Sequence, residues 1–78
     1  MLMRIILYLI EFEKVVNSMT TDQKLQFSQT AEEVLESLQK EIDSEETNAE
    51  ERFQASRSYR LISKERDIVR KYLNQEKK

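Results

Sequence analysis

The 78-residue chain contains no glycine and no proline, and this double absence constrains its fold more than any other feature. Proline breaks helices, and glycine supplies the positive-φ conformations that two-residue β-hairpin turns need. Without either residue, helix is the favoured structure wherever apolar residues recur at helical spacing. The sequence therefore predicts an all-α fold in which residues 1–78 form one domain.

The first apolar segment spans residues 2–16 and carries few charges. Its main stripe is widened by further apolar residues on both sides, so the helix is apolar around most of its girth. Helices of this kind are buried in the middle of a protein. We therefore expect this helix to be central and largely buried.

Two further amphipathic segments follow, at about 21–43 and 48–74. The first begins with a capping-box pattern at Thr20 and Gln23, and the second with the same pattern at Thr47 and Glu50. A short polar turn at 43–47 separates them, and residues 75–78 are expected to fray. The sequence predicts a small three-helix bundle whose second and third helices form an antiparallel hairpin. One long helix over 21–74 is the alternative, because no glycine or proline marks the turn.

A chain of this size needs help to stabilise a core. Below about 70–80 residues a single core rarely supplies more than about 3–5 kcal/mol, and disulfides or metals usually assist. This chain has neither cysteine nor histidine, and 13 of its first 19 residues are apolar. We expect self-association, with a dimer favoured, or a bound protein partner. The candidate contacts on the first helix are Met3, Leu7 and Ile10.

Charge is divided unevenly along the chain. Residues 1–48 hold four basic and ten acidic residues, a net charge of −6, whereas residues 49–78 hold nine basic and five acidic residues, a net charge of +4. One interpretation is that the second and third helices complement each other internally. The other is a positive docking stripe on the third helix, interrupted by Asp67 and made of Arg57, Arg60, Lys64 and Lys71. Tyr59 is a separate candidate contact on the same helix.

Few residues in the chain can perform chemistry. Without histidine or cysteine, imidazole catalysis, thiol chemistry and the usual zinc sites are excluded. Glu32, Glu33 and Glu36 fall on the predicted solvent face of a helix, which favours a solvated surface over a metal site. We also expect no cleft of the roughly 300 Å³ that a substrate needs. The sequence therefore predicts a non-enzymatic protein without a cofactor.

No apolar run approaches the roughly 20 residues of a membrane-spanning helix. The apolar beginning of the chain lacks the cleavage pattern of a signal peptide, and the lack of cysteine fits a cytoplasmic location. Attachment of the first helix to a membrane surface is disfavoured because Glu11 and Glu13 lie on it.

These observations favour a small helical protein–protein interaction module, acting as a regulator, adaptor or inhibitor by docking a helix face on a partner. The alternative is a trihelical nucleic-acid-binding protein that uses the basic third helix. An overall negative charge argues against it. A structural coiled-coil rod is a third possibility, disfavoured because Ser28 and Arg66 fall within the seams.

Overall fold

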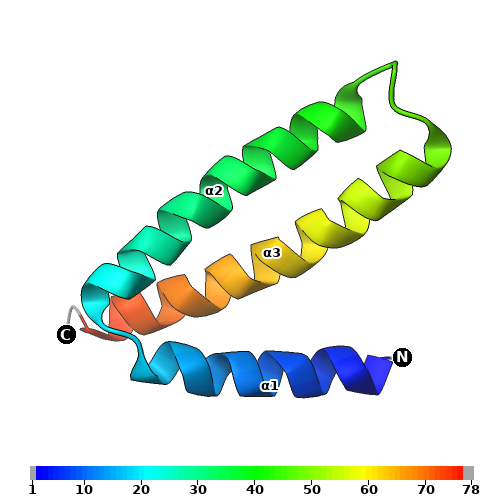
Figure 1. The fold of residues 1–78 in the computed structure, drawn as a ribbon. Coiled ribbons are helices and arrows are strands. Elements are labelled where there is room, and N and C mark those ends of the chain that lie inside the picture. Colours follow the sequence, from blue (N-terminus) through cyan, green and yellow to red (C-terminus); the bar gives the residue numbers. More distant parts are fainter. Residues whose placement is uncertain (1, 77–78) are drawn as a thin grey trace.

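The computed structural model describes the backbone of residues 2–76 and the side chains of residues 4–76. It contains α1 (Leu2–Ser18), α2 (Thr21–Asp43) and α3 (Ala49–Glu76), and the described part has no strand. Figure 1 shows α2 and α3 as a long hairpin, with α1 along the other side of α3. The predicted small all-α fold of three helices is confirmed.

The hairpin of α2 and α3 forms because each helix carries one apolar stripe, although polar or charged residues interrupt it at Ser28, Glu65 and Arg66. Ala31 and Leu35 of α2 and Ala55 and Val69 of α3 are buried, and the two alanines allow close approach of the helices. Residues 44–48 form a turn between α2 and α3. The antiparallel hairpin is thus confirmed, and the alternative of one long helix is wrong.

Local capping explains where the two hairpin helices begin. The Thr20 hydroxyl accepts a hydrogen bond from the Gln23 amide at 3.1 Å, and the Thr20 amide donates to the Gln23 side chain at 2.9 Å, as predicted. The second capping box, predicted at Thr47 and Glu50, is wrong by one residue. Asn48, not Thr47, caps α3, accepting from the Glu51 amide at 2.8 Å and donating to the Glu51 carboxylate at 3.4 Å, which agrees with the stronger capping preference of asparagine.

Two helices are longer than predicted. α1 continues to Ser18 rather than residue 16. α3 continues to Glu76, so the fraying expected from residue 75 does not include residues 75 and 76; residues 77 and 78 lie outside the described part. Glu76 is held because its carboxylate accepts hydrogen bonds from Lys24 and, at 2.8 Å, from Thr21.

The expectation that the first helix is central and buried is wrong. α3 is the middle helix, and α1 lies at the edge of a molecule measuring 45 × 27 × 15 Å (Figure 1). Val16 is fully buried, but most large apolar side chains of α1 are exposed: Ile5, Ile6, Leu7, Tyr8, Ile10 and Val15. The two matching stripes of α2 and α3 cover each other, which leaves α1 only one side of α3 to pack against.

Candidate docking surface

Several charged side chains are used to join α2 to α3. The Arg66 guanidinium donates to Glu32 at 3.1 Å, and Arg70 donates to the same carboxylate oxygen. Glu32 is therefore half-buried at the helix–helix edge, and its predicted place on the solvent face is wrong. Arg66 is partly exposed, as predicted, with 20% of its side chain accessible. At this edge the acidic second helix does complement the basic third.

Three other cations of α3 stay exposed, and we call Arg57, Arg60 and Lys64 the basic stripe. None of the seven ion pairs among the described residues includes a member of this stripe. Asp67, which interrupts the stripe in the sequence, lies 3.3 Å from Arg66. Lys71, two turns further along the same side of α3, lies 3.9 Å from Glu13 of α1, so this predicted site residue differs from the other three in having a carboxylate partner.

A groove opens between the basic stripe and the first turns of α1. α1 and α3 converge toward their C-terminal ends and diverge toward the N-terminus of α1 (Figure 1). The opening holds a hollow of about 530 Å³, which we call the α1–α3 groove. It is lined by two apolar residues, the basic stripe and two polar residues: Ile5, Leu61, Arg57, Arg60, Lys64, Gln54 and Ser58.

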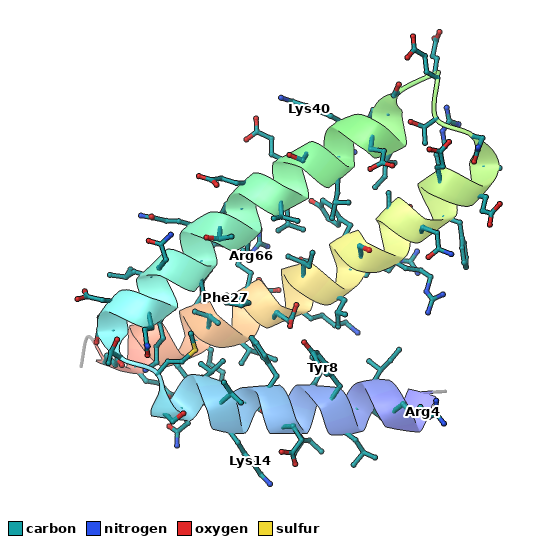
Figure 2. All side chains as sticks on the ribbon, in the orientation of Figure 1. Arg4, Tyr8, Lys14, Phe27, Lys40 and Arg66 are labelled. Atoms are coloured by element: carbon teal, nitrogen blue, oxygen red, sulfur yellow. The ribbon has the colours of Figure 1, made fainter. Side chains whose placement is uncertain are left out.

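The angle of α1 against α3 is set by polar contacts that the sequence reading did not identify. The Tyr8 hydroxyl donates to the buried carboxylate of Glu65 at 2.5 Å, and Figure 2 shows Tyr8 directed toward α3. The hydrogen bond to Glu65 raises the pKa of Tyr8, helped by burial and by the charge of Glu65. Glu65 could have been identified from the sequence, because it lies one turn from both Leu61 and Ile68. A carboxylate at that spacing falls inside an apolar stripe.

A second set of contacts holds the C-terminal half of α1. The Tyr72 hydroxyl donates to Glu13 at 3.3 Å, and the ring of Phe12 lies 5.5 Å from that of Phe27 in α2. Burial raises the pKa of Tyr72, with further contributions from the charge of Glu13 and its hydrogen bond, while Lys24 acts in the opposite sense. Tyr72 and Glu13 thus hold α1 and α3 together where the two helices converge. The α1–α3 groove lies at the other end, where they diverge.

The predicted contacts on α1 lie elsewhere. Leu7 and Ile10 are 58% and 46% exposed. Leu7 lies about 180° and Ile10 about 120° around α1 from buried Val16, because residues advance about 100° each along a helix. The side chain of Met3 lies outside the described part of the structure. The two predicted groups of site residues therefore occupy different surfaces.

Two aromatic residues of α3 differ in what they offer a partner. Tyr59 is half-buried one turn after Ala55, on the side that packs against α2, so it lies away from the basic stripe. Phe53 is 60% exposed, and the Arg57 guanidinium lies 5.8 Å from its ring centre. Phe53 is not among the predicted site residues, although it lies four residues before Arg57 on the same helix face.

Two further open hollows of about 360 and 510 Å³ lie along the α2–α3 hairpin, one near its turn beside Glu50 and Glu51 and one near its open end beside Leu25. Neither is lined by the basic stripe.

Two other kinds of feature are absent from the described residues, a metal site and a membrane-spanning helix. No acidic cluster there has the arrangement of a metal site, and no helix in that part is long and apolar enough to cross a membrane. No protein family, curated protein or solved structure shows a significant match to the chain.

Proposed function

We propose that the chain is a non-enzymatic protein–protein interaction module that docks an acidic, amphipathic helix of a partner in the α1–α3 groove. Such a module can act as a regulator, adaptor or inhibitor. A cytoplasmic location, expected from the absence of cysteine, belongs to the same proposal.

The composition of the groove carries this proposal. Its apolar part consists of Ile5 and Leu61, both partly exposed, and beside them stand three cations that take part in none of the ion pairs among residues 4–76. Amphipathic helices bind hydrophobic grooves through anchors spaced three or four residues apart. An acidic flank on such a helix would meet Arg57, Arg60 and Lys64, which lie within two turns of α3.

Arginine makes this surface suited to protein recognition. Its planar guanidinium pairs with carboxylates through two parallel hydrogen bonds and stacks on aromatic rings, and arginine is enriched among residues that dominate binding energy. Arg57 lies 5.8 Å from the centre of the Phe53 ring, a contact that leaves its positive charge available to a partner.

Affinity capture from native extract tests the proposal with charge-matched variants. Arg57→Glu/Lys64→Glu reverses two cations of the groove, whereas Lys14→Glu/Lys40→Glu reverses two exposed cations elsewhere. Both variants have the same net charge. We expect the first to lose an acidic protein that the wild type and the second variant retain. Equal retention or equal loss by the two variants would refute the proposal.

The basic stripe also supports the second candidate, nucleic-acid binding, because its cations have no carboxylate partners in the described part of the chain. Phosphate contacts are strongest at low salt. An electrophoretic shift of duplex or single-stranded probes at about 50 mM salt, abolished by Arg57→Glu/Lys64→Glu, would favour this candidate. No shift under those conditions would exclude it.

A further inference from the structure

The outward side of α1 is an apolar face distinct from the α1–α3 groove. We define this outer face as Ile6, Leu7 and Ile10, which are 46–58% exposed although all three are large aliphatic residues. Lys14 continues it by one turn, and Figure 2 shows its side chain directed away from α3. Nothing within the described chain covers this face.

Charged residues of opposite sign flank one side of the outer face. Arg4 and Glu11 are seven residues apart, so they lie on nearly the same side of the helix, next to Leu7. Both are exposed. The ion pair of Glu11 at 3.4 Å is with Lys14, an exposed neighbour three residues away, and such surface pairs hold their partners weakly.

This order of charges is self-complementary under a two-fold rotation. When a second α1 is laid antiparallel on the first, the same flank of each helix meets at the same edge of the interface. With Leu7 opposite Ile10 of the other copy, Arg4 lies within two residues, or about 3 Å along the axis, of Glu11 of that copy, and the arrangement occurs twice. In a parallel pair this flank would instead meet the opposite flank of the second helix, and both Arg4–Glu11 contacts would be lost.

We propose that a second copy of the chain covers the outer face, forming a two-fold symmetric dimer through an antiparallel pair of α1 helices. The core consists of Leu7 packed on Ile10 of the partner copy, and two Arg4–Glu11 pairs set the direction. Self-complementary contacts of this kind are the rule in two-fold symmetric dimers. Flanking charges commonly decide the orientation of paired helices.

The observations favour a second copy over a lipid surface. Helices that lie on membranes carry mainly lysine and arginine beside their apolar face, whereas Glu11 lies beside this one. The charges instead complement those of an antiparallel second copy, with Arg4 of each helix near Glu11 of the other. A pair of short helices buries less than the roughly 800 Å² per partner of a standard interface, so we expect dissociation in the micromolar range. The dimer leaves the α1–α3 groove open and does not depend on the proposed function.

Sedimentation equilibrium between about 1 and 500 μM, a range that brackets micromolar dissociation, tests the dimer with a charge swap. We expect Arg4→Glu and Glu11→Arg each to weaken dimerisation about tenfold, because two attractions become two repulsions. Arg4→Glu/Glu11→Arg should restore it. Leu7→Gln should weaken it without loss of helix by circular dichroism, since the site is exposed. Glu36→Lys/Lys40→Glu, a swap of an exposed pair on α2, is the control and should change nothing.

Three results would overturn the dimer proposal. The first is a monomer throughout this concentration range, including a monomer that binds anionic vesicles. The second is a dimer that the single reversals leave unchanged or that the double swap fails to restore. The third is a dimer abolished by Arg57→Glu/Lys64→Glu, which would place the second copy in the α1–α3 groove.

Discussion

The hydrogen bond from Tyr8 to Glu65 makes a sharp prediction about how α1 is held. Glu65 is only 8% exposed, and the Tyr8 hydroxyl is its hydrogen-bond partner among the described residues. Tyr8→Phe removes the hydroxyl and keeps the ring. The carboxylate then stays under α1 without its donor, which is the costly way to lose a buried hydrogen bond.

The magnitude follows from the burial of the two partners. An unsatisfied buried polar group costs about 1–3 kcal/mol. Because the Tyr8 residue is 46% exposed, water replaces part of the lost bond, and we expect the lower part of this range, about 1–2 kcal/mol. The loss falls on α1, since α2 and α3 keep their shared core. Amide hydrogen exchange in α1 should accelerate about five- to thirtyfold, with much smaller changes in the hairpin.

Two variants separate this effect from loss of packing. Tyr8→Phe/Glu65→Met removes both polar partners and should recover most of the stability, since replacing both by apolar groups is nearly neutral. Tyr59→Phe is the control, because no hydrogen bond of the Tyr59 hydroxyl is present among the described residues, and it should change stability by less than about 0.5 kcal/mol. The reasoning is refuted if Tyr8→Phe behaves like Tyr59→Phe, or if exchange accelerates equally in all three helices.

Three further predictions concern the hairpin. Hydrogen bonds from Lys24 and Thr21 lower the pKa of Glu76. The ionised Glu76 carboxylate therefore stabilises the fold at pH values above the ordinary glutamate pKa, and this stabilisation is lost as the pH falls through the lowered pKa of Glu76. Thermal melts of Glu76→Gln at a series of pH values should lack this part of the acid dependence. Leu35→Ala should cost about 2–4 kcal/mol in urea unfolding because Leu35 is buried, whereas Leu7→Ala at dilute, monomeric concentration should cost less than about 0.5 kcal/mol. Asn48→Ala should cost about 1 kcal/mol and Thr47→Ala much less, a ranking that would reverse if Thr47 capped α3.

The hairpin could be predicted from the sequence because the features that specify it lie within each helix and at its ends. Each of its two helices carries one apolar stripe, so periodicity specifies both the helix and the face that it buries. Thr20 and Gln23 likewise identify the start of α2 to the residue. Where two capping boxes overlapped, at Thr47 and Asn48, spacing alone did not distinguish them, and the better capping residue prevails.

The position of α1 could not be predicted in the same way. A helix that is apolar on nearly every side has no unique buried face, so its pattern does not specify which neighbour covers it. The contacts that orient it are polar and join residues 57 and 59 positions apart, Tyr8 to Glu65 and Glu13 to Tyr72. Spacing identified the basic stripe, whereas the groove beside it depends on the angle between α1 and α3.

Site-specific photo-cross-linking in native extract tests the docking proposal most directly. A photoreactive phenylalanine analogue at Leu61 places the probe in the α1–α3 groove, and the same analogue at Leu25 places it in the separate hollow at the open end of the hairpin. We predict an adduct at Leu61, absent at Leu25 and lost with Arg57→Glu, to a helical peptide rich in aspartate and glutamate with apolar residues three or four apart. Equal labelling at both positions, or labelling at Leu61 that survives Arg57→Glu, would contradict the account.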